Sequence, residues 1–413
     1  MDLSELPDGM TMTEQEPAFE YMAQAASLFI NGEAKLVISE KALAITTLFD
    51  AVEIPFSEMN ELRLANYAVT IRADSGDYIL SRMGSWCDPF YAALCDAYNK
   101  AVLRSLFISG KPTITARGEY RYTELNKASS GEAPVHVYEN NMTFLPPNIG
   151  ARRVPLCFVS SMETGSFELT LRLNTGESYT CAKLGFDTAP LEAAIEKHLR
   201  TLREKTLAAV KDIDPSLATT PASQLAKLMP EGAAAPIGQL ATIAPSFAAA
   251  LEGKIATTRA ASSYAMFKEM CDPAQIWVGF RKNEGTRGSA VDSDEDPDAV
   301  VDPYLLWLIA PSPDGQCAVV EFAEANSASF VYRTGGDFFA FARQLNRALE
   351  AINFKREVIR LSDEELRKPE NVDYFMAAKR TTALQFIRAN FLGRIIHSSP
   401  ESWKRNLLNY FKG

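Results

Sequence analysis

One stretch of the chain is repeated about a hundred residues later, and this duplication constrains the fold more than any other feature of the sequence. The first copy covers residues 67–94 and the second covers residues 167–195. In each copy, apolar and polar residues alternate up to a turn that contains glycine, and an apolar stripe follows. The pattern predicts a strand, a tight turn, a second strand, a short loop and a helix.

The repeat extends upstream of this stretch, so the stretch is the closing half of a longer unit. The matches fall at turns, at a proline and at the helix start, which are the positions that a shared fold requires. A period of this length is one whole small domain, because solenoid repeats have only about 20–50 residues. The matched segments are Glu20-Tyr21 with Glu119-Tyr120, Gly32-Glu33-Ala34 with Gly131-Glu132-Ala133, Glu40 with Glu139, Ile54-Pro55-Phe56 with Val154-Pro155-Leu156, Thr70-Ile71-Arg72 with Thr170-Leu171-Arg172, Gly76-Asp77 with Gly176-Glu177, Arg82-Met83-Gly84 with Lys183-Leu184-Gly185, and PFYAAL at 89–94 with PLEAAI at 190–195.

Each unit is expected to be a run of short strands closed by one amphipathic helix. In the first unit, residues 20–30 fit either a short helix or an edge strand. The helix is expected to begin at Asp88, an N-cap acceptor, followed by Pro89 at the first helical position. The strands are expected at 35–39, 42–49, 52–59, 67–73 and 78–83. The apolar stripe of the helix is Phe90, Leu94, Ala97 and Ala101.

An antiparallel meander followed by one C-terminal capping helix resembles the pleckstrin-homology-like fold. The two units, at 20–107 and 119–207, look like tandem domains of this kind, similar to the bacterial and GRAM-type relatives. The resemblance rests on the order of elements and the placement of turns. It implies two antiparallel β-barrel or β-sandwich domains, each closed by a C-terminal helix. It implies little chemistry, because many unrelated functions share this fold.

The fold class expected for the whole chain is therefore α+β. The chain is too long for one hydrophobic core. We expect a flexible lead-in at 1–18, the first unit at 19–110, the second unit at 111–211, a helical connector at 212–263, a divergent third α+β unit at 264–360 and C-terminal helices at 361–413.

The connector is rich in Ala and Pro, and helices are expected at 224–229 and 237–251. It is either a packed helical hairpin or a mobile connector, and its apolar residues favour packing. The third unit is expected to have strands at 275–281, 304–310, 316–322 and 329–333, and an acidic disordered loop at 285–302. Its helix has the stripe Phe338, Phe341, Leu345, Leu349 and Ile352. The tail, with helices at 363–396 and 400–411, belongs to no repeat and is a candidate docking element.

Charge and composition exclude several classes of function. The chain of 413 residues has a net charge of -10, which argues against binding to nucleic acid. The start of the chain is acidic and polar and does not resemble a signal peptide, and no apolar run approaches the roughly 20 residues that span a bilayer. The six cysteines form no C-x-x-C pair, so reduced thiols in the cytoplasm are expected.

No catalytic or cofactor signature is present, and no cofactor is expected. The histidines, His136, His198 and His397, have no ligand or triad spacing, and His198 is expected to pack in the core. The acidic run from Asp292 to Asp298 resembles the opening of a calcium loop, but it lacks the glycine and the closing glutamate of that loop. A solvated acidic loop is the favoured interpretation, and no metal site is predicted.

Two basic pairs are the candidate ligand-binding residues. Arg152 and Arg153 follow a turn whose counterpart contacts inositol phosphates in lipid-binding members of the pleckstrin-like family, although two arginines that simply lie on the surface are the plainer interpretation. Arg281 and Lys282 lie near Gly279, Gly285, Gly288 and Arg287, without the spacing of a phosphate-binding loop.

The function that the sequence favours is a non-enzymatic cytoplasmic scaffold or adaptor that binds an unknown protein partner through sheet edges, loops or C-terminal helices. The first alternative is a peripheral lipid- or phosphoinositide-binding protein that uses Arg152, Arg153, Arg281 and Lys282; a membrane surface is not favoured. The second alternative is an enzyme of an unrecognised kind, which a cleft of clustered residues with shifted pKa values would reveal. The sequence leaves the partner, the pathway and the oligomeric state open.

Overall fold

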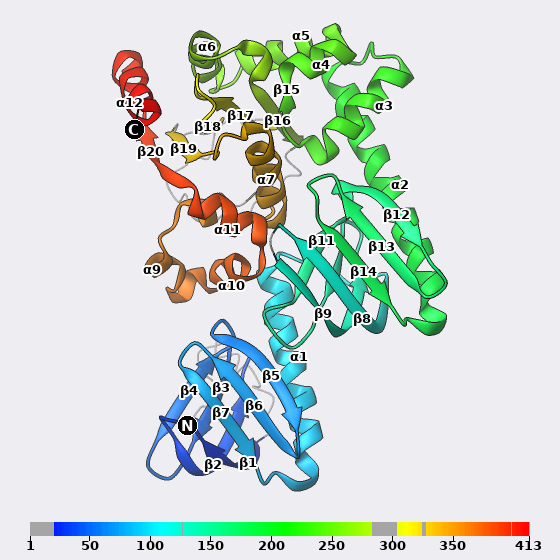
Figure 1. Cartoon of the computed structure of the whole chain (residues 1–413), viewed down its shortest axis with the longest axis vertical. Coiled ribbons are helices and arrows are strands. Elements are labelled where there is room, and N and C mark those ends of the chain that lie inside the picture. Colours follow the sequence, from blue (N-terminus) through cyan, green and yellow to red (C-terminus); the bar gives the residue numbers. More distant parts are fainter. Residues whose placement is uncertain are drawn as a thin grey trace, which may run out of the picture. The chain divides into compact units, whose positions relative to one another are not determined.

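The computed structural model describes residues 20–125, 127–282, 304–323, 328–354, 356–397 and 399–412. The described part is an α+β structure with three antiparallel sheets, which fit a tandem β-domain architecture (Figure 1). The chain divides into two compact units. The first is Met1–Leu103 with Pro147–Ile149, and the second is Arg104–Pro146 with Gly150–Gly413. The expected lead-in at 1–18 and most of the acidic loop, with Gly285, Arg287, Gly288 and Asp292–Asp298, lie outside the described residues.

The first unit contains a seven-stranded sheet in the order β4-β3-β2-β1-β7-β6-β5. A short 3-10 helix, η1 (Gly84–Trp86), leads into helix α1 (Cys87–Ser105). The segment Pro147–Ile149 extends the sheet beyond β5, because Leu62 donates its N–H to the Pro147 carbonyl at 2.8 Å and Ile149 donates to the Asn60 carbonyl at 2.9 Å. The strands are β1 (Glu20–Ala26), β2 (Asn31–Ile38), β3 (Ala42–Thr46), β4 (Ala51–Pro55), β5 (Met59–Ala65), β6 (Ala68–Ala73) and β7 (Gly76–Ser81).

The second unit begins with a sheet of the same kind, whose strands follow the equivalent order β11-β10-β9-β8-β14-β13-β12. The short helix η3 (Gly185–Asp187) leads into α2 (Thr188–Ile213), which buries Leu191, Ile195 and Leu202 against this sheet. Another short helix, η2 (Leu156–Phe158), precedes β12. The strands are β8 (Ile114–Glu124), β9 (Lys127–Val137), β10 (Asn141–Phe144), β11 (Arg152–Pro155), β12 (Val159–Thr164), β13 (Glu168–Leu173) and β14 (Ser178–Ala182).

The joint between the last strand and the helix has the same backbone path in both copies. Arg82 and Lys183 have φ of 59° and 55°, and Gly84 and Gly185 both have φ of 58°. Glycine adopts this left-handed conformation without the steric cost that a side chain imposes. The repeated basic–apolar–Gly triplet of the sequence is therefore explained by backbone geometry.

Two details of the first unit differ from the sequence prediction. Residues Glu20–Ala26 form strand β1, so the helix alternative is wrong; the strand alternative is confirmed, except that β1 pairs with both β2 and β7 and is therefore not an edge strand. Helix α1 begins at Cys87, so Asp88 lies in its first turn and is not the N-cap. The expected apolar stripe is confirmed, with Phe90, Leu94 and Ala101 buried and Ala97 half-buried.

The third sheet has six strands in the order β15-β16-β17-β18-β19-β20, which differs from the order in the first two sheets. Its outer strands come from the connector and from the tail, outside the range 264–360. Residues 391–396 form a strand because their backbone pairs with β19, so the prediction of helix up to residue 396 is wrong there. The strands are β15 (Ala235–Pro236), β16 (Trp277–Lys282), β17 (Tyr304–Pro311), β18 (Cys317–Phe322), β19 (Ala328–Arg333) and β20 (Phe391–Ile396).

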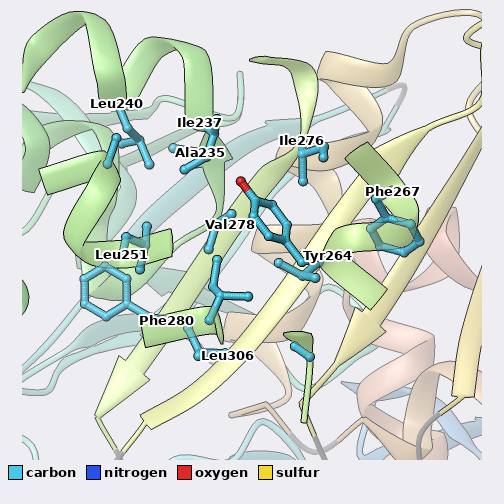
Figure 2. Packing of buried hydrophobic residues seen from close by; sticks show 14 of the residues in the cluster. Ala235, Ile237, Leu240, Leu251, Tyr264, Phe267, Ile276, Val278, Phe280 and Leu306 are labelled. Carbon is cyan, nitrogen blue, oxygen red and sulfur yellow. The ribbon is translucent and has the colours of Figure 1, made fainter. Parts of the chain in front are cut away.

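Helices cover both faces of the third sheet. Alternate residues of one strand contribute to two separate cores, as Val278 and Trp277 of β16 do. On the Val278 side the sheet packs against the connector helices and the last helix. Figure 2 shows Leu240, Leu251 and Tyr264 gathered over Val278 and Phe280. The helices of this core are α3 (Thr219–Leu228), α4 (Ile237–Ile243), α5 (Pro245–Ala256), α6 (Ala261–Met270) and α12 (Pro400–Lys412). The connector is therefore packed, as its apolar residues indicate.

The opposite face packs against α7 (Phe338–Ala351) and α11 (Thr382–Ala389). The predicted stripe of α7 is confirmed, because Phe341, Leu345 and Leu349 are fully buried in this core and Phe338 and Ile352 belong to it. Three short helices lie between α7 and α11 in the chain. They are α8 (Glu357–Arg360), α9 (Asp363–Leu366) and α10 (Val372–Arg380).

Gly279 lies inside β16, directly opposite Trp307 of β17. A Cβ atom at position 279 would lie 2.1 Å from the Trp307 ring, so only glycine leaves room for the indole. Gly279 therefore lies within the strand expected at 275–281 and not in a phosphate-binding loop. The residue is needed for packing between strands.

We predict that Gly279→Ala destabilises the third sheet by about 1–3 kcal/mol, because an overpacked core forces the ring or the strand to shift. Gly253→Ala is the control, because the added methyl on α5 meets no atom within 4 Å. It is expected to stabilise by about 1 kcal/mol, since Ala is favoured over Gly in a helix. Urea unfolding followed by tryptophan fluorescence measures both, and equal changes in the two variants would contradict the packing explanation.

Candidate functional site

Arg152 and Arg153 lie on β11 and are each only 6% exposed, because α7 packs against this strand. The interpretation of the two arginines as a pair of surface residues is therefore wrong. Both guanidinium groups are already engaged by carboxylates within the second unit. Neither arginine therefore offers an exposed positive charge to a lipid headgroup, so this arrangement does not support the lipid-binding alternative.

The two arginines belong to a buried charge cluster, which consists of Glu124, Arg152, Arg153, Glu177, Arg347 and Glu350. Arg347 of α7 is central to it. Its Nε lies 3.3 Å from Glu177 Oε1, its Nη1 lies 3.3 Å from Glu350 Oε2, and its Nη2 donates to the Arg153 carbonyl at 3.0 Å. Arg153 in turn lies 2.7 Å from Glu350 Oε1. Such pairing offsets the cost of removing the charges from water.

Glu124 has the best-satisfied carboxylate of the charge cluster. Arg152 Nε donates to it at 2.9 Å, the Tyr179 hydroxyl at 2.5 Å and the Thr382 hydroxyl at 2.6 Å. Burial alone would raise the pKa of Glu124, but these partners outweigh burial and hold the pKa below its ordinary value. Burial raises the pKa of Tyr179 well above its ordinary value, and the Glu124 carboxylate adds to the shift. The charge cluster is therefore ionised at Glu124 and neutral at Tyr179.

The charge cluster leaves almost no empty space. The cavity that it lines, together with Leu106, Arg380 and neighbouring residues, has a volume of about 10 Å³. That volume corresponds to about one water molecule and leaves no room for a substrate. Shifted pKa values at this place thus reflect structural ion pairing, and they do not support the alternative of an enzyme.

A neighbouring group of side chains has the residue types of a metal site. One ligand atom each from Cys157, Glu231 and Glu350 lies within 4.8 Å of the others. Burial and the two carboxylates raise the pKa of the Cys157 thiol well above its ordinary value, and the Arg153 and Arg347 guanidinium groups lie close by. A protonated thiol and adjacent cations fit a metal ion poorly. The sequence offered no signal for this group, because its members are far apart in the chain.

The second basic pair lies elsewhere in the second unit. Arg281 donates to Asn353 Oδ1 at 3.2 Å, and its guanidinium lies over the ring of Phe354. Lys282 forms an exposed ion pair with Asp212 at 3.2 Å. The two candidate pairs therefore have different partners, and they do not form one basic surface.

The histidines occupy three different environments. His198 is buried on α2, as expected, and its Nε2 lies 2.9 Å from the Thr113 hydroxyl. Burial lowers the pKa of both His198 and His136. These contacts are those of packed histidines.

His397 lies close to a serine and a carboxylate that the sequence did not connect with it. Its Nε2 is 3.0 Å from Ser329 Oγ and 3.3 Å from Glu321 Oε2. In a catalytic triad the serine and the carboxylate bind different ring nitrogens, whereas here one nitrogen faces both. Ser329 is fully buried and accepts a hydrogen bond from Trp403 Nε1 at 2.8 Å. The group therefore anchors α12 to the third sheet.

The first unit exposes apolar side chains at the tips of two turns, and we call them the apolar turn surface. Between β1 and β2, Leu28 is 93% exposed and Phe29 is 56% exposed. Between β3 and β4, Leu48 is 86% exposed and Phe49 is 88% exposed. A Cβ placed on Gly32 would lie 3.9 Å from Thr47, so the two turns are at the same end of the sheet.

The two turns are built in the same way. Ser27 Oγ accepts hydrogen bonds from the backbone N–H groups of Phe29 and Ile30, both at 3.1 Å. Thr47 Oγ1 accepts from Phe49 at 3.4 Å and from Asp50 at 3.0 Å. These hydroxyl-capped turns hold the apolar tips in place. The repeated Ser/Thr-Leu-Phe triplet is the sequence signal that could have found this surface.

Acidic side chains accompany the apolar turn surface. The turns and the strand ends next to them, at 27–34, 46–53 and 73–78, contain no Lys or Arg. Their charged residues are Glu33, Asp50, Glu53, Asp74 and Asp77. This end of the first unit therefore combines exposed apolar groups with negative charge.

Comparisons with known proteins identify no family. No family model matches the chain, and no curated protein matches it. Among solved structures the chain is similar to the Spt16D Pob3N heterodimer, with 14% sequence identity, a TM-score of 0.15, and coverage of 38% of this chain and 84% of that chain. A likeness at this level carries no argument about fold or function. None of the helices in the described residues has the length and apolar character needed to cross a bilayer.

We predict that Arg152→Met destabilises the protein by about 3–5 kcal/mol at neutral pH, because it leaves Glu124 buried without its main counter-charge. In the native protein the low pKa of Glu124 contributes stability above about pH 4.5, which is lost as the pH falls through the folded-state value. In the variant, burial raises the pKa of Glu124, so the destabilisation is expected to shrink toward pH 4.

Urea unfolding at pH 7 and at pH 4 measures this difference. The control is Arg172→Met, which breaks the exposed ion pair with Glu163 and is expected to change stability too little to resolve. A destabilisation by Arg152→Met that does not change with pH would contradict the assigned ionisation of Glu124.

Proposed function

We propose that the chain is a non-enzymatic adaptor whose apolar turn surface binds a protein partner, and that its first two sheet domains have the pleckstrin-homology-like fold. The fold proposal is supported by the shared strand order of the two sheets and by the helix that follows each. The six cysteines are all free thiols, which supports a cytoplasmic location.

The observation that carries the proposal is the exposure of four large apolar side chains on two preformed turns. Leu28, Phe29, Leu48 and Phe49 are held in place by the capping hydroxyls of Ser27 and Thr47, so binding them costs little backbone entropy. Exposed apolar patches with a polar rim typically mark interaction sites. Aromatic and aliphatic anchors of this kind are the usual core of a protein interface.

The acidic rim indicates the chemistry of the partner. Asp50 lies within one turn, and Glu33 and Asp77 lie on the adjoining strands. We therefore expect a partner protein with an apolar pocket that is surrounded by Lys and Arg, since complementary charge steers association. The same negative charge disfavours an anionic bilayer, so it supports a protein partner over the alternative of a lipid headgroup.

We predict that the double substitution Leu48→Ser/Phe49→Ser weakens the binding of the specific partner and leaves the first unit folded. The tagged chain and its variants are used for affinity purification, and the protein that co-elutes is then purified and titrated by calorimetry. The affinity is expected to fall at least tenfold in the double variant, because hot-spot anchors contribute about 2 kcal/mol or more each. The affinity is also expected to weaken as salt is added.

Phe186→Ser is the matched control, because Phe186 is fully exposed but lies in the second unit. It should leave binding unchanged. Retention of the same partner by the double variant, or strengthening of the complex by salt, would overturn the proposal. Flotation with vesicles of phosphatidylcholine alone and with phosphatidylserine added provides the test of the lipid alternative, and binding that requires the anionic lipid would support that alternative instead.

A further inference from the structure

The second unit contains a cavity of about 300 Å³ that none of the features above accounts for. Three parts of this unit surround it. They are the turn after β13, with Asn174 and Thr175; the end of α3, the start of α4 and the segment that joins them, with Lys227 and Gln239; and helix α7, with Phe339 and Arg343. This volume is at the lower end of the range for small-molecule sites, about 300–1000 Å³.

Aromatic rings form part of the wall. Trp277 is only 5% exposed, whereas Phe339 is nearly half exposed. The two rings meet edge to face, with centroids 5.5 Å apart. Phe158 is another buried ring of the lining. A flat apolar group in the cavity would therefore meet aromatic faces and edges, which interact favourably with aromatic ligands.

One buried donor of the wall is unused. The indole N–H of Trp277 has no hydrogen-bond partner among the described residues. Leaving a buried donor without an acceptor is unfavourable, so such groups usually have a partner. The other buried amide of the lining is already satisfied, because Asn346 accepts from the Ala234 N–H and donates to the Ala234 carbonyl, both at 2.9 Å. The Nε1 atom itself is covered by protein atoms, so a ligand in the cavity would meet the carbon atoms of the Trp277 ring and not this N–H.

The charge of the lining has one sign. Its charged residues are Lys227 and Arg343, and no Asp or Glu lines the cavity. Both cations are exposed, and the structure gives neither of them an ion pair or a hydrogen bond within the described residues. Two free cations beside an aromatic wall favour an anionic ligand.

We propose that this cavity binds a small organic anion with one flat apolar end, such as an aromatic carboxylate or sulfonate. The apolar end packs on Trp277, Phe339 and Phe158, and the anionic group meets Arg343 and Lys227. This site is separate from the apolar turn surface, so the proposal goes beyond the protein-binding function and does not depend on it.

The test is a titration of the ¹⁵N-labelled full chain with naphthalene-1-sulfonate, followed through the side-chain indole N–H resonances. The chain has four tryptophans, and Trp277→Phe assigns the resonance of Trp277. We expect the Trp277 resonance to shift with a saturable dependence on the probe. We expect the double variant Lys227→Gln/Arg343→Gln to bind at least tenfold more weakly, which corresponds to about 1.4 kcal/mol, because it removes both charge-assisted contacts to the anionic group.

Two controls isolate the role of charge. Lys197→Gln/Arg200→Gln removes two exposed cations of α2 that do not line the cavity, and it should leave the affinity unchanged. The neutral analogue 1-naphthalenemethanol should bind at least tenfold more weakly than the sulfonate. The proposal is overturned if the Trp277 resonance does not shift at millimolar probe, if the neutral analogue binds equally well, or if the Lys227/Arg343 variant retains the native affinity. None of these outcomes bears on the protein partner of the first unit.

Discussion

The ion pairs that α7 makes with the second sheet determine how the second unit is assembled. Arg347 and Glu350 stand one turn apart on this helix, and they face Glu177 and Arg153 of the sheet domain in matching order. Burying these charges is costly, and only correct pairing offsets the cost. A rotation of the helix or a shift by one residue would leave buried charges without partners. The charge cluster therefore contributes less to net stability than to the choice of one arrangement over others.

The same helix face also forms the proposed anion cavity. Arg343, Asn346, Arg347 and Glu350 stand at positions i, i+3, i+4 and i+7, which places them on one side of a helix. Asn346 is fixed to Ala234 of the connector, and Arg343 lines the cavity beside it. The opposite side of α7 carries the phenylalanine and leucine stripe that packs on the third sheet. The geometry of the cavity thus depends on a helix that is held on two sides, by apolar packing and by ion pairs.

The sequence was sufficient for features that depend on local signals. The two copies share the alternation of apolar and polar residues, the turn at Gly76 and the joint at Arg82-Met83-Gly84, because each copy needs the same backbone conformations. The apolar stripe of α7 follows from helical periodicity. It was insufficient where pairing joins distant segments. Strand β15 has two residues, too few for any periodic pattern, and β20 is a strand only because β19 provides a partner. Ion pairing between Arg153 and Glu350 likewise has no local sequence signal, which is why two buried arginines resembled a surface pair.

The two copies of the repeat differ at the turn between their third and fourth strands, where the first unit exposes part of its apolar turn surface. In the second copy the segment between β10 and β11 includes Pro147–Ile149, which belongs to the first unit and is hydrogen-bonded to its strand β5. The corresponding segment of the first copy is the turn with Leu48 and Phe49, whose side chains are almost fully exposed. Two copies that arose by duplication started with the same turn at this position. In the second copy this turn makes a contact within the chain, so the fold tolerates residues that form contacts here. Because the Ser27 and Thr47 hydroxyls hold the apolar tips in the same capped geometry, their exposure is a property of a defined structure. A rigid turn with exposed apolar side chains fits a surface that recognises a partner better than it fits a loop that is merely variable.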